Sequence, residues 1–167
     1  MSDSIHSIGT HIPRLRRYAR ALTGDAESAD DLVQDTVERA LVKFALWQQG
    51  TDLRAWLFTI MHNLFVNQLR LRRTDVTGDD IEDIPVRGGE TDHLEVSDLD
   101  SALQRLPGEQ REVLLLVALE QLSYQETATL LEIPIGTVMS RLSRARARLR
   151  AVLARSGEGG TPLKRVK

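Results

Sequence analysis

The chain has 167 residues, 41% of them hydrophobic and 4% aromatic, and a formal net charge of −2, which suits one globular domain or two small ones. It has no cysteine, which excludes disulfides, thiolate zinc sites and cysteine nucleophiles. The four histidines, His6, His11, His62 and His93, lack the spacing of metal ligands, so we expect neither a metal nor a cofactor.

Three helices are predicted in the N-terminal half, after a flexible N-terminus at residues 1–9. The first helix carries apolar residues at helical spacing, namely Ile12, Leu15, Ala19 and Leu22. Pro13 lies near its first turn and Gly24 just past its end, which is the usual asymmetry of helix ends. The second helix is expected from about residue 25 to 46, and the third from about residue 53 to 73.

The second and third predicted helices each carry a polar stripe beside an apolar face. The inner face of the second consists of Leu32, Val33, Thr36, Val37, Ala40, Leu41 and Phe44. Its polar stripe consists of Asp31, Gln34, Asp35 and Glu38. The apolar side of the third consists of Trp56, Leu57, Ile60, Met61, Leu64 and Phe65. Its polar stripe consists of Asn63, Asn67 and Arg70, which fall at i, i+4 and i+7.

The stretch at residues 75–100 separates the two halves of the chain. It holds ten acidic residues against Arg87 alone, a local charge of −9, and shows no sustained helical or strand period. We therefore expect an acidic flexible linker at residues 75–97. This linker joins an N-terminal domain at residues 10–74 to a C-terminal domain at residues 98–154.

The C-terminal domain is predicted to contain a helix-turn-helix. Ser123 and Glu126 form the S-x-x-E capping box of a helix start, and Pro134 marks the break that follows that helix. The next helix is expected across P-I-G-T-V-M-S-R-L-S-R-A-R-A-R-L at residues 134–149. Its apolar stripe consists of Val138, Leu142, Ala145, Leu149 and Val152.

The remaining surface of this last helix is polar and basic. It consists of Thr137, Ser140, Arg141, Ser143, Arg144 and Arg148. No acidic residue lies between Pro134 and Arg155, so this surface suits phosphates and guanine edges. An ordinary helical hairpin with a solvated arginine-rich face is the alternative. A disordered basic tail is expected at residues 155–167.

Four motifs in one order give the chain a specific resemblance. They are A-D-D-L-V-Q-D-T-V-E-R-A-L (29–41), R-A-W-L-F-T-I-M-H-N (54–63), L-P-G-E-Q-R-E-V-L-L-L (106–116), and Y-Q-E-T-A (124–128) followed by P-I-G-T-V-M-S-R-L-S-R-A-R (134–146). Together with the acidic joint, they resemble the extracytoplasmic-function (ECF) group of bacterial sigma factors over about residues 10–153. The resemblance implies an all-α fold of two small helical domains.

The resemblance also implies contacts with RNA polymerase and with promoter DNA. In that family the N-terminal domain binds the clamp helices of the largest subunit of core RNA polymerase and opens the −10 element, and the C-terminal helix-turn-helix binds the −35 element. The implied polymerase contacts are Asp31, Gln34, Asp35 and Glu38. The implied −10 contacts are Trp47 and Asp52 in the loop at 47–52, with Asn63, Asn67, Arg70, Arg72 and Arg73. The implied −35 contacts are Tyr124, Thr137, Ser140, Arg141, Ser143, Arg144 and Arg148.

Several alternatives accompany these assignments. The acidic stripe suits a solvated helix face, and Trp47 and Trp56 suit a hydrophobic core. Two positions depart from the family pattern: Asn67 stands where aspartate is usual, and Glu132 stands in the turn where many helix-turn-helix motifs have glycine. These departures put in doubt a charge-dependent role at the first position and the turn geometry at the second.

Three functions remain open from the sequence: a polymerase specificity subunit, a stand-alone helix-turn-helix regulator, and a sigma-like decoy for an anti-sigma factor. An enzyme is not expected, because no carboxylate pair, nucleophile triad or phosphate loop is found. Neither a signal peptide nor a run of roughly 20 apolar residues is present. We therefore expect a cytoplasmic protein without membrane insertion, monomeric when free of partners, with an anti-sigma factor as a further partner.

Overall fold

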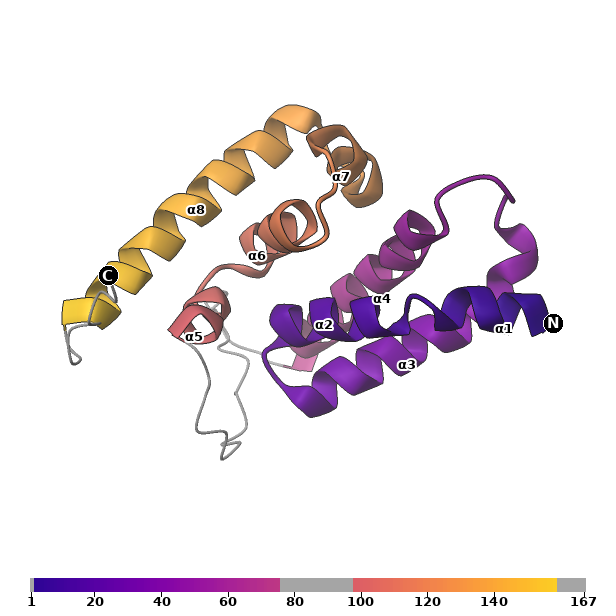
Figure 1. Cartoon of the computed structure of the whole chain (residues 1–167). Helices are drawn as coiled ribbons and strands as arrows, with labels where there is room; N and C mark the ends of the chain where they lie inside the picture. Colours follow the sequence, from indigo (N-terminus) through magenta and orange to yellow (C-terminus); the bar gives the residue numbers. More distant parts are fainter. Residues whose placement is uncertain (1, 76–97, 159–167) are drawn as a thin grey trace, which may run out of the picture.

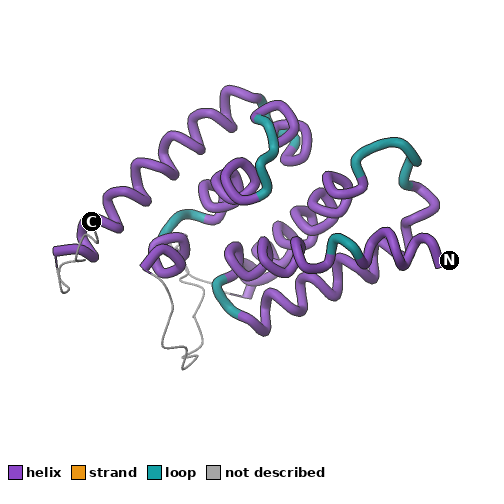
Figure 2. Tube along the Cα trace, viewed as in Figure 1, coloured by secondary structure: helices purple, strands orange, loops and turns teal. Residues whose placement is uncertain are grey.

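The computed structural model describes residues 2–75 and 98–158. Helices and short helical turns are the only regular secondary structure in these two ranges (Figure 2), which confirms the all-α prediction. Residues 76–97, which contain nearly all of the predicted acidic linker, lie outside the described residues, as do residues 159–167 of the predicted tail.

The N-terminal half consists of α1 (Ser2–Gly9), α2 (Ile12–Thr23), α3 (Ala26–Lys43), the short 3-10 turn η1 (Phe44–Leu46) and α4 (Leu53–Asp75). The predicted ends of α2 are confirmed, because Pro13 lies in its first turn and Gly24 ends it with a left-handed φ of 74°. Asp25 caps α3, since its carboxylate accepts hydrogen bonds from the Ser28 amide at 3.0 Å and from the Ser28 hydroxyl at 2.8 Å. Helices α2, α3 and α4 pack together (Figure 1).

Two expectations about the N-terminal half are wrong. The segment expected to be flexible at residues 1–9 is helical over Ser2–Gly9, because α1 packs against α3 and leaves Ile8 only 1% exposed. Leu41, expected on the inner face of α3, is 40% exposed. A helix turns by about 100° per residue, which carries Leu41 past the edge of the face that buries Leu32, Thr36 and Ala40.

The C-terminal half consists of α5 (Asp98–Gln104), α6 (Gly108–Leu114), the π-helical turn η2 (Leu115–Leu119), α7 (Tyr124–Leu131) and α8 (Ile135–Glu158). The predicted capping box is present: the Ser123 hydroxyl accepts from the Glu126 amide at 3.0 Å, and the Glu126 carboxylate accepts from the Ser123 amide at 3.4 Å. Glu132 ends α7 in the left-handed region with φ 55°, which is the strained turn expected from the missing glycine.

Helix α8 is longer than predicted. It continues to Glu158, so residues 155–158 are helical and do not belong to a disordered tail. No proline occurs in residues 150–158 and Gly157 lies only in the last turn, so nothing in the sequence stops the helix at residue 154.

The two halves pack against each other. Helix α2 contacts α5, α6 and η2, and α4 contacts α7 (Figure 1). The buried apolar side chains of both halves form one continuous cluster, from Ile8 in α1 to Ala145 in α8. Where the halves meet, the packing also buries the charged side chains of Arg111, Glu112 and Glu120. We call this boundary the seam.

Candidate functional site

The predicted polymerase stripe lies on the solvent-facing side of α3. Asp31, Gln34, Asp35 and Glu38 are all exposed. Within the stripe, the Gln34 side-chain amide donates a hydrogen bond to Glu38 Oε1 at 3.3 Å, an i, i+4 contact along the helix. The stripe does not face the C-terminal half, because α3 packs against α1, α2, η1 and α4. These four side chains are therefore brought together on an accessible acidic surface.

The predicted −10 residues lie on α4 and on the loop before it. Asn63, Asn67 and Arg70 are exposed along one side of α4, as predicted from their spacing. Arg72, two residues after Arg70 and therefore nearly on the opposite side of α4, is also exposed, whereas the Arg73 side chain lies outside the described part of the structure. Asp52 is exposed and precedes α4, where its carboxylate accepts from the Arg54 amide at 3.0 Å.

Trp47 packs against an aromatic side chain at the start of the loop at residues 47–52. Its ring lies 5.4 Å from the Phe44 ring, and Phe44 also meets Trp56 edge-on at 6.5 Å. Among the described residues, the Trp47 Nε1 atom is buried without a hydrogen-bond partner. The tryptophans thus anchor the loop at residues 47–52 to the core, which fixes the position of Asp52 beside the start of α4.

The predicted −35 surface lies mainly on the first half of α8. Ser140, Ser143, Arg144 and Arg148 are exposed, and Thr137 and Tyr124 are partly buried. Arg141 is also partly buried and forms an ion pair with the exposed Glu109 at 3.6 Å. The opposite face of α8 is buried through Val138, Leu142 and Ala145, so the predicted division of this helix is confirmed.

Comparisons with known proteins match both halves of the chain. Residues 8–62 match the family described as the Sigma2 domain of PhyR, and residues 97–149 match Sigma-70, region 4. The chain is 41% identical over 157 residues to the ECF RNA polymerase sigma factor EcfG of Rhodopseudomonas palustris (strain TIE-1), covering 92% of this chain and 87% of EcfG. The chain belongs to the ECF sigma factors of bacterial RNA polymerase.

Solved structures of related proteins agree with the ECF sigma fold. The sigma factor RpoE from Bartonella quintana, in complex with the anti-sigma factor NepR, is 36% identical, with a TM-score of 0.76 over 92% of this chain and 98% of that one. CnrH, in complex with the cytosolic domain of CnrY, is 27% identical, with a TM-score of 0.64 over 89% of this chain and 86% of that one.

The seam of this sigma factor contains charged residues that sequence reasoning left without a role. Glu120, just after η2, has a fully buried side chain. Its Oε2 lies 3.5 Å from Arg14 Nε, and its Oε1 lies 3.7 Å from Arg17 Nη2. Arg54 of α4 donates from Nη1 to the Glu120 main-chain carbonyl at 3.3 Å. Three arginines of the N-terminal half therefore surround one carboxylate of the C-terminal half.

Burial dominates the electrostatics of this cluster. Burial raises the pKa of Glu120, and the positive charges of Arg14, Arg17 and Arg54 oppose that rise without cancelling it. The pKa of the buried Tyr18 hydroxyl lies well above its usual range, first because of burial and then because of the negative charges of Glu112 and Glu120. Tyr18 therefore stays neutral at physiological pH.

Further polar contacts cross the seam. The Gln104 side-chain amide donates to the Ala21 carbonyl at 3.0 Å, and Arg111 Nη1 donates to the Leu22 carbonyl at 2.8 Å. His62 Nδ1 contacts Glu112 Oε1, which joins α4 to α6. These residues were not predicted to meet, because nothing in local spacing pairs side chains 50 or more positions apart.

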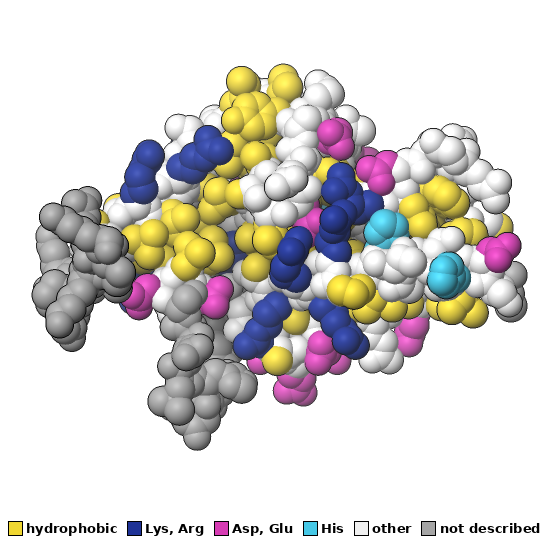
Figure 3. Space-filling model, viewed as in Figure 1, with side chains coloured by type: hydrophobic (Ala, Val, Ile, Leu, Met, Phe, Trp, Pro, Cys, Tyr) yellow, Lys and Arg dark blue, Asp and Glu magenta, His cyan; other side chains and the backbone are white. Residues whose placement is uncertain are grey.

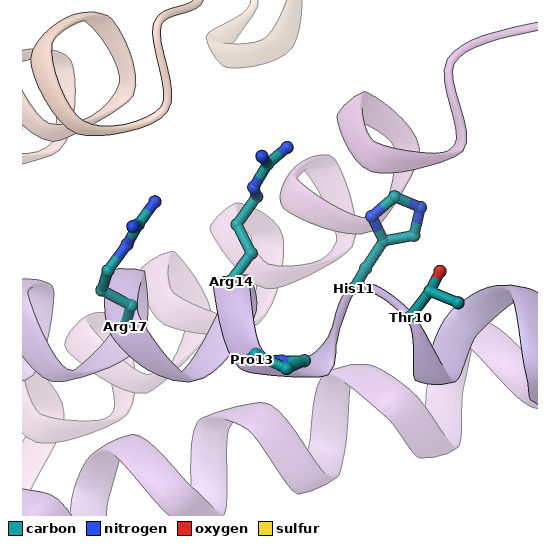
Figure 4. A pocket seen from close by; sticks show the side chains of 5 residues that line it. All are labelled: Thr10, His11, Pro13, Arg14 and Arg17. Carbon is teal, nitrogen blue, oxygen red and sulfur yellow. The ribbon is translucent and has the colours of Figure 1, made fainter.

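A basic groove adjoins the seam. It is a hollow of about 610 Å³ lined by Thr10, His11, Pro13, Arg14 and Arg17. Figure 4 shows the side chains of His11, Arg14 and Arg17 projecting from α2 on the same side, and Figure 3 shows basic side chains gathered across the middle of this face beside two histidines. The one sequence feature that could have indicated the groove is that α2 carries four arginines and no acidic residue.

Within the described ranges, no helix is long and apolar enough to cross a membrane, and no cluster of three or more histidine, aspartate or glutamate side chains could hold a metal ion. ECF sigma factors are in general not enzymes.

Proposed function

We propose that this ECF sigma factor, which directs RNA polymerase to promoters, binds the core enzyme through α3 and promoter DNA through α4 and α8. The observation that carries the proposal is the coexistence of three exposed polar surfaces on separate helices. One is acidic, one combines amides with arginine, and one is basic. A stand-alone helix-turn-helix regulator would need only the last of these, so the proposal accounts for more of the molecule.

The acidic stripe on α3 suits the clamp helices of the polymerase. Opposite charges steer the association of two proteins and fix the register of their contact. Asp31, Asp35 and Glu38 supply three carboxylates on one face, and Gln34 adds an amide between them. In the packed arrangement of the two halves this face stays open, so polymerase binding through α3 needs no prior rearrangement.

Replacement of Asp35 by arginine tests the polymerase contact. We expect Asp35→Arg to weaken core polymerase binding at least about tenfold, which corresponds to roughly 1.4 kcal/mol. Asp30→Arg is the matched control, because Asp30 is also exposed on α3 but lies about 140° away from Asp35 around the helix. Titration of labelled sigma factor with core polymerase measures both affinities. Equal affinity for the two variants would contradict the assignment.

The exposed side of α4 and the loop at residues 47–52 suit the opened −10 element. Capture of an unpaired base requires a pocket for the base and cations for the backbone. We propose that Trp47, Asp52 and Asn63 hold the base and that Asn67 hydrogen-bonds through its amide. Arg70, Arg72 and Arg73 would then contact phosphates nearby.

The basic face of α8 suits the major groove at the −35 element, with Tyr124, Thr137, Ser140, Arg141 and Ser143 around the central arginine. A bidentate arginine contact with guanine provides roughly 1–3 kcal/mol of discrimination. We expect Arg144→Ala to relax the preference at one base position of this element. Arg148→Ala should instead weaken all sequences about equally and lower the slope of log affinity against log salt by about 1.

A panel of −35 elements with single-base changes distinguishes these two outcomes. Binding is measured at several salt concentrations for the wild type and both variants. If Arg144→Ala lowered affinity uniformly and kept every base preference, α8 would not contact the bases as proposed.

We also propose an anti-sigma factor as a partner, because the 36%-identical RpoE was solved with the anti-sigma factor NepR. A sigma-like decoy is the second candidate, favoured by the match of residues 8–62 to the Sigma2 domain of PhyR. A decoy needs no polymerase contact, so the Asp35 experiment also separates the two functions. We propose that the protein acts in the cytoplasm, where polymerase and DNA are found, and is a monomer until it binds them.

A further inference from the structure

Glu120 is an imperfect partner for the arginines of the seam. Charge-assisted hydrogen bonds between guanidinium and carboxylate are about 2.7–2.9 Å long, whereas the two ion pairs here measure 3.5 and 3.7 Å. Among the described residues, no donor reaches either carboxylate oxygen of Glu120 with standard hydrogen-bond geometry, and the contact with Arg17 is a weak, long one. The carboxylate is thus fully buried with only long contacts to the arginines, so its pairing with them is easily exchanged.

The arginines themselves remain open to an outside ligand. The side chains of Arg14 and Arg17 are 43% and 58% exposed, and the hollow beside them reaches His11. The two arginines lie three residues apart on α2, about 4.5 Å along the helix axis, so both can contact one anionic chain. An anion that approaches from solvent therefore competes with Glu120 without being buried.

The position of the groove favours nucleic acid as this ligand. Arg54, which donates to the Glu120 carbonyl, also forms an ion pair with Asp52 at 3.8 Å, so the Glu120 cluster adjoins the loop at residues 47–52. That loop is where we propose that an unpaired base is held. The planar guanidinium binds phosphate oxygens in pairs, which suits the backbone of a strand leaving that loop.

We propose that Arg14 and Arg17 bind the phosphodiester backbone of single-stranded DNA in competition with Glu120. The proposal rests on the proposed function only for the identity of the strand, which would be the promoter strand opened beside the loop. When phosphates engage the arginines, Glu120 is left as a buried carboxylate without counter-ions, which disfavours the packed arrangement. Binding of the strand in the groove therefore releases the C-terminal half.

The groove is tested with a fluorescein-labelled oligothymidine strand, and its affinity for the full-length protein is measured by anisotropy at several salt concentrations. We expect the double variant Arg14→Gln, Arg17→Gln to bind more weakly and to lower the salt slope by about 1.4, which is about 0.7 for each lost phosphate contact. Arg16→Gln is the matched control, because Arg16 is exposed on the same helix and does not line the hollow. If the double variant and Arg16→Gln lost the same affinity for the strand, the proposal would be overturned.

The role of Glu120 is tested with Glu120→Gln, which removes the competing charge and keeps the shape of the side chain. We expect this variant to bind the strand roughly fivefold more tightly. The chain has no cysteine, so spin labels can be attached through Glu27→Cys on α3 and Arg150→Cys on α8. The strand should lengthen the distance between the labels in wild type and leave it short in Glu120→Gln. Equal affinities, or equal responses of the label distance, would overturn the proposal.

A polyglutamate peptide serves as a competitor in the same assay. If it displaces the strand as well as unlabelled oligothymidine does, the groove is an acidic-protein site and the proposal is wrong. Oligothymidine contains no promoter, so failure in these assays leaves the proposed sigma-factor function standing. If Asp35→Arg left polymerase binding unchanged, the measured affinity of the groove for oligothymidine would still test this proposal.

Discussion

Arg111 and Glu120 are both buried charged residues at opposite ends of the helix formed by α6 and η2, yet their surroundings differ. Arg111 donates to the carbonyls of Leu103, Leu22 and Leu106 at 2.8 Å and of Gln104 at 3.0 Å. The Glu120 carboxylate, by contrast, has among the described residues only two long ion pairs, with Arg14 at 3.5 Å and with Arg17 at 3.7 Å. A buried charged group stabilises a fold when its hydrogen bonds are satisfied. When they are not satisfied, the contacts of that group are easily broken.

The two residues therefore have different roles in the packed arrangement. Arg111 binds the turn between α5 and α6 and ties it to the end of α2, so it belongs to the permanent structure. Glu120 faces three arginines of the other half and keeps a raised pKa in spite of them. The comparison predicts opposite effects on stability when each charge is removed.

The largest effect is expected at Arg111. Arg111→Met keeps an apolar stem but leaves four carbonyl groups without their donor, so the free energy of unfolding should fall by about 3–5 kcal/mol. Arg105→Met is the control, because Arg105 is exposed in the same turn and should change stability by less than about 0.5 kcal/mol. Urea unfolding followed by circular dichroism measures both. Similar free energies of unfolding for the two variants would contradict the structural role assigned to Arg111.

An intermediate effect is expected at Asp25, a carboxylate that makes its hydrogen bonds. Asp25→Ala removes the cap of α3 and should lower the free energy of unfolding by about 1 kcal/mol, whereas Asp25→Asn should retain most of the cap. The bonds from Ser28 lower the pKa of Asp25, so its contribution is present above about pH 3.9 and disappears as pH falls through the lowered pKa. Unfolding curves at several pH values check this, and a loss that persists unchanged at low pH would contradict it.

The smallest effect, of opposite sign, is expected at Glu120. Glu120→Gln should leave the free energy of unfolding unchanged or raise it by up to about 1 kcal/mol, because a neutral side chain is less costly to bury. The raised pKa means that the wild type gains stability as pH falls from neutral through that pKa, with the gain complete near pH 4.3. Glu120→Gln should lack this gain. A wild type that instead lost stability relative to the variant on acidification would refute the assigned sign.

Much of the candidate site followed from sequence because it depends on one helix at a time. The exposed stripe of Asp31, Gln34, Asp35 and Glu38 and the buried stripe of α8 follow from a period of 3.6 residues. The predicted capping box of Ser123 and Glu126 likewise joins neighbours three residues apart. Helix α1 was missed because it does not depend on local pattern alone. It is held by the burial of Ile8 against α3, a contact that no sequence period indicates.

The sequence by itself determined five helices, α2, α3, α4, α7 and α8, and most of the apolar side of each, because these depend on residues within about one turn of each other. Only the tertiary structure decided that Glu120 lies among Arg14, Arg17 and Arg54, and that Arg111 binds the end of α2. Periodicity separates the buried from the exposed side of a helix but does not pair polar groups from distant segments. Packing of the two halves makes those pairs, and at Glu120 it makes one that an outside anion can replace.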